Sequence, residues 1–291
     1  MFKKVLVPVD FSPASHTALN YAIELTRGKN QIVLIHVFPS KIREMVIFYD
    51  VPERVKSLEM QVEELRERAA SELEKMAESL SKKGISVKSI FLEGEPAQAV
   101  IEESSKGYDL VVVGIPAKKV QIANTSYTIV KGVKTNCLVV KESRAKFTLK
   151  KVLFAADFSE VSKKAFKEFA LKFKKEFNVE MTVLNVFELY PLPYVEHGAT
   201  WLLGDLEQVK KNLEKRLISE YEGKGISYSV IEGADAGIEI VDFADKGKYN
   251  LIILTREEKS WMEKAFLGSV SAKVVKLTKK PVLICQTKLD D

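Results

Sequence analysis

Two copies of one short motif decide the fold of this chain. Residues 3–12 read Lys-Lys-Val-Leu-Val-Pro-Val-Asp-Phe-Ser, and residues 150–159 read Lys-Lys-Val-Leu-Phe-Ala-Ala-Asp-Phe-Ser. Each copy consists of a basic pair, an apolar run, an aspartate and a Phe-Ser pair. The second copy begins about halfway along the 291-residue chain, so the repeating unit has the size of a domain rather than of a solenoid repeat.

The motif predicts a buried strand that leads into a helix. The apolar run over 5–9 is rich in β-branched residues, as in parallel strands that are covered on both faces. Ser12 is a good N-cap, and Pro13 suits the first helical position. Ligands of open α/β sheets bind beyond the carboxyl ends of the strands, which is where Asp10 and Asp157 lie. The alternative is that each aspartate only caps its helix.

Composition restricts the class of protein. The chain has 46% hydrophobic residues and a net charge of +5 from 45 basic and 40 acidic residues, which indicates a globular protein without a dedicated nucleic-acid surface. No apolar stretch is long enough to span a membrane, and the N-terminus does not read as a secretory signal. Cys137 and Cys285 lie in apolar runs and are expected to be buried thiols. We therefore expect a cytoplasmic protein.

The rest of each half alternates strands with helices. Residues 31–38 and 181–187 read as second strands, and the apolar stripe over 53–82 predicts a long helix that its counterpart at 206–221 repeats. Strands three to five follow in both halves, with last helices near 124–134 and 269–279. This order predicts an α/β fold of two doubly wound, five-stranded parallel-sheet domains. The expected boundaries are 1–142 for the first domain, 143–149 for a polar linker and 150–291 for the second.

Two long connections, 39–52 and 188–205, are either lids over a site or surface excursions. Other chemistry has little support in the sequence. The chain has no phosphate loop of the Gly-x-x-x-x-Gly-Lys type and no Gly-x-Ser-x-Gly elbow. Its three histidines, His16, His36 and His197, lack metal-ligand spacing. We expect His36, in the buried second strand, to be a hydrogen-bonded core histidine rather than a catalyst.

The repeated segments resemble the universal stress protein family. The resemblance rests on Val-Pro-Val-Asp-Phe-Ser at 7–12, Ile-His-Val at 35–37 and Tyr-Asp-Leu-Val-Val-Val-Gly at 108–114, and it recurs in each half, as in a tandem member. Many members of the family bind ATP. The resemblance implies a site built from the aspartate after strand one, a valine after strand two, and a glycine-containing loop that ends in Gly-Ser at a helix N-terminus.

The resemblance implies a degenerate form of that site, chiefly in the second domain. Gly268 and Ser269 are kept there, whereas Thr255 and Glu258 stand where the family has glycines. The implied nucleotide-binding residues of the second domain are Ala156, Asp157, Val186, Thr255, Arg256, Gly268, Ser269, Val270 and Ser271. A second, weaker set in the first domain comprises Pro8, Asp10, Val37 and Gly114.

Three functions remain open at this point. The first is a stress-response or regulatory protein that binds ATP or AMP, with or without Mg²⁺, and has no strong catalysis of its own. The second is a slow ATP hydrolase or adenylyl transferase. The third is an interaction module whose nucleotide sites have decayed. The resemblance also implies that the fifth strands, 137–140 and 282–285, pair within one chain, and we expect self-association into a homodimer. We expect neither nucleic acid nor a membrane as a partner.

Overall fold

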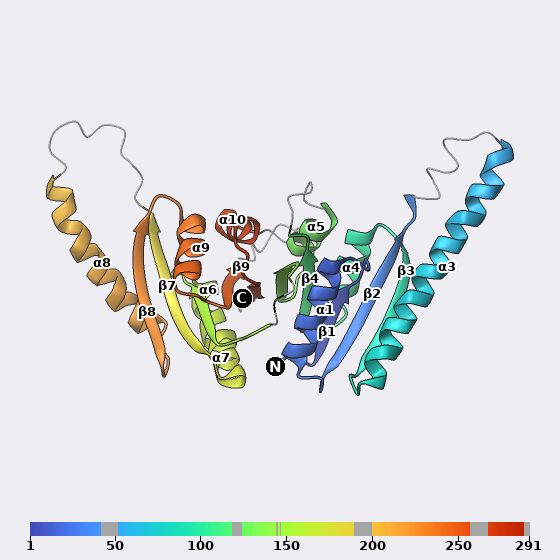
Figure 1. Ribbon diagram of the computed structural model, residues 1–291. Coiled ribbons are helices and arrows are strands. Elements are labelled where there is room, and N and C mark those ends of the chain that lie inside the picture. Colours follow the sequence, from blue (N-terminus) through green and yellow to red (C-terminus); the bar gives the residue numbers. More distant parts are fainter. Residues whose placement is uncertain are drawn as a thin grey trace. The chain divides into compact units, whose positions relative to one another are not determined.

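The chain divides into two compact units in a computed structural model. The N-terminal domain spans Phe2–Phe147, and the C-terminal domain spans Thr148–Asp291 together with Met1. The structure describes residues 1–41, 52–117, 124–143, 145, 147–188, 200–256 and 267–287. Both domains are α/β, as predicted (Figure 1). The predicted boundaries of the domains and of the linker stay predictions.

The N-terminal domain is built on a parallel sheet in the order β3-β2-β1-β4-β5. Its central strand β1 pairs with β2 on one side and β4 on the other, so that Val5 lies between Ile32 and Leu110. Strands β1, β2, β4 and β5 are largely buried, as the β-branched runs predict. The strands are β1 (Lys4–Pro8), β2 (Gln31–Pro39), β3 (Val87–Gly94), β4 (Leu110–Ile115) and β5 (Cys137–Lys141).

Helices cover both faces of this sheet. The crossovers place α1 (Pro13–Thr26) and α3 (Pro52–Lys82) on one face and α4 (Pro96–Ser104) and α5 (Asn124–Gly132) on the other. Figure 1 shows α3 running along the edge strand β3. The order of the strands reverses between β1 and β4, because the chain first moves outward to β3 and then crosses back. A ligand site is expected at such a reversal.

The C-terminal domain repeats this plan with the order β10-β9-β6-β7-β8. Its strands are β6 (Lys151–Ala155), β7 (Glu180–Glu188), β8 (Ile226–Gly233), β9 (Leu251–Arg256) and β10 (Val282–Gln286). After the first helix, which is described below, its helices are α8 (Thr200–Glu220), α9 (Ala236–Lys246) and α10 (Ser269–Leu277). Cys137 and Cys285 are buried free thiols, as predicted, and burial raises the pKa of Cys285 well above its ordinary value.

The first helix of the C-terminal domain differs from its counterpart α1. The sequence predicts one continuous helix after Ser159, but a π-helical turn, η1 (Phe166–Ala170), separates α6 (Glu160–Ala165) from α7 (Leu171–Phe177). Phe166, the first residue of this turn, and Phe173, which follows it in α7, are fully buried. A π turn adds a residue without changing the apolar character of the helix, so the spacing of apolar residues did not reveal it.

Two expectations concern segments that the structure describes only in part. Of the connection 39–52, residues 42–51 lie outside the described residues, and so do residues 189–199 of the connection 188–205. Within the described ranges, no helix combines the length and the apolar character that crossing a membrane requires.

Candidate functional site

The repeated Asp-Phe-Ser motif forms the same turn in both domains. The Oδ1 atoms of Asp10 and Asp157 each accept a hydrogen bond of 3.0 Å from the amide of the serine two residues on. The intervening phenylalanines, Phe11 and Phe158, have positive φ angles of 61° and 62°. The N-caps are the serines, since Ser12 and Ser159 accept hydrogen bonds from the first turns of α1 and α6. The aspartates therefore shape the turn and keep their remaining oxygen for another partner.

The carboxylate of Asp10 is held in its charged form. Partial burial raises its pKa, but hydrogen bonds from the side chain and backbone of Ser12 and from Ser15 outweigh burial, and the net pKa is lowered. A carboxylate that stays ionised is only an acceptor of hydrogen bonds. Asp10 thus offers lone pairs to a neighbouring donor across the neutral pH range.

In each domain, a polar side chain on the second strand forms a hydrogen bond to the backbone where this turn begins. In the N-terminal domain, Nδ1 of His36 lies 2.7 Å from the carbonyl oxygen of Val9. In the C-terminal domain, the amide of Asn185 donates to the carbonyl oxygen of Ala156 over 2.8 Å. Val9 and Ala156 directly precede the two aspartates, so both contacts fix the backbone where the first strand ends.

A cavity of about 260 Å³ opens at the carboxyl ends of β1, β2 and β4 in the N-terminal domain. It lies at the reversal of strand order, where ligands of doubly wound sheets bind. All four residues of the weaker predicted set line it, namely Pro8, Asp10, Val37 and Gly114. The cavity also has a lining that the sequence did not predict, which includes Ser15, His36, Pro39, Pro96, Val100 and Ser126.

Side-chain acceptors dominate the polar wall of this cavity. The hydroxyl of Ser15 donates to the carbonyl oxygen of Ser12 over 3.0 Å, and that of Ser126 donates to the carbonyl oxygen of Gly114 over 3.1 Å. Their oxygens keep lone pairs for a ligand, as does the carboxylate of Asp10. Thr125 and Ser126, which line the cavity, also belong to the first turn of α5, whose amides lack partners within the helix. The cavity therefore combines an acceptor wall with an anion-favouring helix N-terminus.

Gly114 is required for packing. A Cβ on this residue would lie 2.2 Å from the carbonyl oxygen of Ala14 in α1. The close approach is between β4 and the start of α1. In the C-terminal domain the corresponding strand residue is Thr255, whose side chain excludes the same approach.

The predicted residues of the C-terminal domain lie on three elements. Ala156 and Asp157 follow β6, Val186 lies on β7, and Thr255 and Arg256 end β9. The backbone amide and the backbone carbonyl of Ala156 are both hydrogen-bonded to residues of β7. The side chain of Arg256 is only 2% exposed. The remaining predicted residues, Gly268, Ser269, Val270 and Ser271, form the N-cap and first turn of α10. Among the described residues, a Cβ on Gly268 would meet no atom within 4 Å, so none of them crowds this N-terminus. Glu258 and Trp261 lie outside the described residues.

The rim of the C-terminal domain carries a carboxylate, that of Glu188, at a position where the N-terminal domain has none. Strand β7 ends in Glu188 where β2 ends in Pro39, and Oε1 of Glu188 accepts from the amide of Ala236 over 2.9 Å. Asp235 caps α9 and forms an ion pair with Lys273 of α10. The protein's own carboxylates thus occupy the N-terminus of α9. A phosphate there would meet negative charge, which disfavours it.

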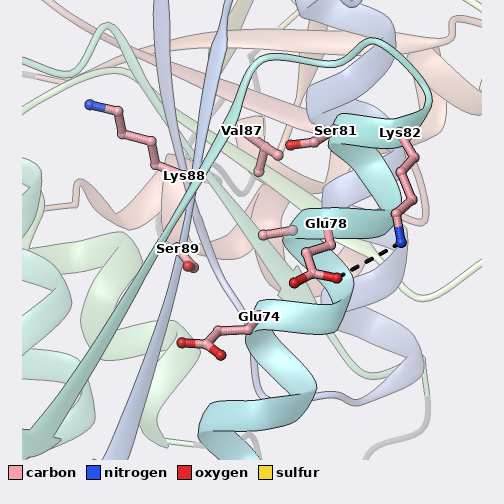
Figure 2. A pocket seen from close by; sticks show the side chains of 8 residues that line it. Glu74, Glu78, Ser81, Lys82, Val87, Lys88 and Ser89 are labelled. Carbon is pink, nitrogen blue, oxygen red and sulfur yellow. Dashed lines mark ion pairs between the residues drawn. The ribbon is translucent and has the colours of Figure 1, made fainter.

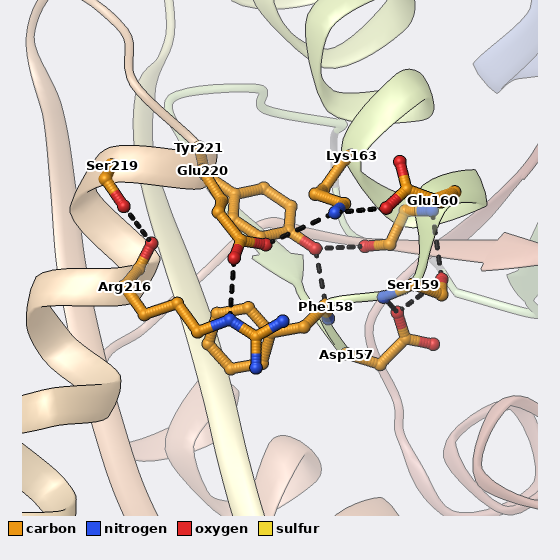
Figure 3. Close-up of polar contacts among 10 residues, drawn as sticks. Asp157, Phe158, Ser159, Glu160, Lys163, Arg216, Ser219, Glu220 and Tyr221 are labelled. Atoms are coloured by element: carbon orange, nitrogen blue, oxygen red, sulfur yellow. Dashed lines mark hydrogen bonds and ion pairs between the residues drawn. The ribbon is translucent and has the colours of Figure 1, made fainter.

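A polar network fixes the Asp157 turn to the end of α8 (Figure 3). The buried hydroxyl of Tyr221 accepts from the amide of Phe158 over 3.1 Å and donates to the hydroxyl of Ser162 over 3.0 Å. The guanidinium carbon of Arg216 lies 4.3 Å from the ring centroid of Phe158, and the same side chain forms an ion pair with Glu220. Lys163 contacts both Glu160 and Glu220. The turn is therefore braced from a helix distant in sequence.

A second hollow, of about 350 Å³, lies between α3 and β3 in the N-terminal domain (Figure 2). Its side chains include Glu74, Glu78, Lys82 and Lys88, and Lys82 pairs with Glu78 at 3.9 Å. Charged side chains of both signs line it, without a convergent set of donors or acceptors. It carries no functional assignment here.

Most of the cavity residues that the sequence analysis missed have no signal in a single sequence. Pro96 and Val100 lie on α4 and Ser126 lies on α5, far along the chain from the Asp-Phe-Ser motif. The expected hydrogen bond of His36 is present, to the carbonyl oxygen of Val9, but the prediction of a core histidine is wrong, because His36 is only half-buried and lines the cavity. No group of three metal-ligating side chains occurs in the part of the chain that the structure describes.

The fold and the cavity define a two-domain, doubly wound α/β protein with a cavity at the switch point of the N-terminal sheet. Comparison with known proteins gives the family: residues 1–141 and 148–286 each match the universal stress protein family, and the chain belongs to it. The predicted tandem organisation is thereby confirmed.

Individual relatives agree with this assignment. Universal stress protein MJ0531 of Methanocaldococcus jannaschii is 34% identical over 139 residues, which cover 46% of this chain and 81% of that protein. Universal stress protein MJ0577 of the same organism is 24% identical, covering 50% and 98% of the two chains. A crystal structure of a universal stress protein from Archaeoglobus fulgidus superimposes with a TM-score of 0.68 at 19% identity, over 98% of both chains. This last similarity concerns the fold alone.

Proposed function

We propose that this chain is a regulatory adenine-nucleotide-binding protein of the stress response and that it binds ATP or AMP in the cavity of the N-terminal domain. The observation that carries the proposal is the convergence of Asp10, His36, Ser15 and Ser126 on one cavity that the first turn of α5 closes. A nucleoside phosphate matches this arrangement. Its amino and hydroxyl groups suit an acceptor wall, and its phosphates suit a helix N-terminus.

The C-terminal set around Asp157, Gly268 and Ser269 stays a second predicted site. The first turn of α10, which no described residue crowds at Gly268, supports it, and the carboxylate of Glu188 counts against it. The two sites can be separated experimentally. Val100→Phe places a larger side chain in the N-terminal cavity, whereas Asp157→Ala removes the carboxylate of the C-terminal site.

The decisive experiment is equilibrium binding of labelled ATP and AMP to the full-length protein, with and without Mg²⁺. We expect one high-affinity site that Val100→Phe abolishes and Asp157→Ala preserves, with circular dichroism showing that both variants are folded. Binding that Asp157→Ala abolishes and Val100→Phe preserves would move the site to the C-terminal domain. No binding of either nucleotide at millimolar concentration, with no adenine nucleotide in a native mass spectrum of the purified protein, would overturn the proposal.

The remaining expectations belong to the same proposal. We place the protein in the cytoplasm and expect a homodimer. Within each chain, the family resemblance supports pairing of strands 137–140 and 282–285 about a pseudo-two-fold axis. Two strands related by such an axis run antiparallel, which would bring Lys141 near Lys280. A lysine cross-link between these two residues within one chain is expected, and cross-links that place the two strands far apart would contradict the pairing.

A further inference from the structure

We propose that Nε2 of His36 accepts a hydrogen bond from the bound nucleotide and thereby helps the N-terminal cavity to select its ligand. The inference rests on the nucleotide-binding function proposed above and assigns a specificity residue to it. It follows from the contacts of the imidazole ring and from the comparison of the two domains.

The first step fixes the tautomer of His36. A carbonyl oxygen can only accept, so the 2.7 Å contact between Nδ1 and the Val9 carbonyl requires a proton on Nδ1. The second domain supports this assignment independently, since the side-chain amide of Asn185 donates to the equivalent carbonyl of Ala156. Both domains therefore place a donor at this point. In the neutral ring, Nε2 then carries a lone pair.

The second step fixes the orientation of the ring. The imidazole lies between two aromatic rings: its centroid is 4.8 Å from that of Phe11 and 5.5 Å from that of Phe91. Phe11 is the positive-φ residue of the Asp10 turn, and Phe91 lies on the neighbouring strand β3. These two ring contacts and the bond of Nδ1 together hold the imidazole in one orientation. The described part of the chain offers Nε2 no hydrogen-bond partner.

The third step concerns the surroundings of Nε2. His36 is half-buried and lines the same cavity as Asp10, Ser15 and Ser126. Nε2 is itself an acceptor in this tautomer, so a ligand group that bonds to it must be a donor. The adenine amino group and the ribose hydroxyls are the donors of an adenine nucleotide. The C-terminal domain has Asn185 here, whose amide is already used on Ala156.

The two sources of a donor can be distinguished with nucleotide analogues. ITP has an oxygen in place of the amino group, and the 2′-deoxy and 3′-deoxy forms of ATP each lack one hydroxyl. The test variant is His36→Asn, because Asn185 shows that asparagine maintains the bond to the strand-one carbonyl in this fold. His16→Asn, at an exposed position of α1, is the matched control.

We expect His36→Asn to weaken ATP binding by roughly 5- to 20-fold and His16→Asn to leave it unchanged. With the analogue that lacks the donor, wild type and His36→Asn should bind equally, which identifies the group. Isotope-edited NMR of the free protein should show a protonated Nδ1 and an unprotonated Nε2. An equal loss with every analogue, no loss at all, or a proton on Nε2 would overturn the inference while nucleotide binding itself stands. Failure of the wild type to bind any nucleotide would instead overturn the proposed function, and this inference with it.

Discussion

The α-carbon of Gly114 on β4 lies against the carbonyl group of Ala14 in α1, so closely that a Cβ on Gly114 would lie 2.2 Å from the oxygen. This contact places the first turn of α1 at the mouth of the N-terminal cavity, which Gly114 and Ser15 both line. Removing the space at Gly114 must therefore displace α1, β4 or both.

Gly114→Ala is expected to lower the free energy of unfolding by about 1–3 kcal/mol, because the new methyl group meets backbone rather than a movable side chain. Nucleotide affinity should fall as well, since Ser15 moves with α1. Chemical denaturation and equilibrium binding measure the two effects. Gly268→Ala is the control, because its Cβ would meet no atom of the described residues within 4 Å and the φ of Gly268 is −55°. Equal stability of Gly114→Ala and wild type would contradict the packing argument.

Tyr221→Phe should destabilise the C-terminal domain. The hydroxyl bridges the amide of Phe158 and the hydroxyl of Ser162 in a fully buried position. Its removal leaves buried polar groups without partners, which costs about 1–3 kcal/mol. Urea denaturation gives the difference. The hydroxyl of Tyr228 is only half-buried, and water can replace its hydrogen bond to the carbonyl oxygen of Tyr221. We therefore expect Tyr228→Phe to cause a smaller loss of stability. A loss at Tyr228 that matches the one at Tyr221 would count against this account.

The same hydroxyl predicts a loss of stability at alkaline pH. Burial, followed by the negative charge of Asp157, raises the pKa of Tyr221 to about 12, although its hydrogen bonds with Ser162 and with the amide of Phe158 act to lower it. The ordinary pKa of tyrosine is about 10. Because the pKa is higher in the folded state, this contribution is complete below pH ~10 and disappears as the pH rises through 12.

Denaturation at a series of pH values, together with tyrosinate absorbance, tests this dependence. The free energy of unfolding of Tyr221→Phe should fall less steeply than that of wild type over the same interval. Identical slopes for the two proteins would show that Tyr221 does not contribute. Tyr108 should contribute in the same sense in the N-terminal domain, since burial and its bond to Glu103 raise its pKa further.

Glu188→Gln should favour anion binding in the C-terminal domain. Glutamine keeps an oxygen for the amide of Ala236, so the N-terminus of α9 remains capped, while a negative charge leaves the rim. If the Asp157 site binds nucleotide, its affinity should rise by roughly 2- to 5-fold, with a dependence on ionic strength. Glu207→Gln, on the exposed surface of α8, is the control for net charge. A weaker affinity in Glu188→Gln would show that the carboxylate has another role.

The sequence by itself determined the duplication, the strand and helix order, the N-caps Ser12 and Ser159, and the edge of each sheet where Asp10 and Asp157 lie. These features are local, because periodicity, capping and strand burial each depend on a short segment of the chain. It did not reveal the π turn at Phe166–Ala170, whose extra residue leaves the apolar pattern unchanged.

Only the tertiary structure decided which residues share a cavity. Ser15, His36, Val100 and Ser126 come from α1, β2, α4 and α5, and no spacing along the chain relates them. The same holds for the C-terminal domain, where Glu188 at the end of β7 reaches the first amide of α9 and changes the charge of the rim. Motifs identify the positions that the fold brings to the edge of a sheet. Whether those positions enclose space for a ligand depends on side chains that other elements contribute, and packing alone brings these together.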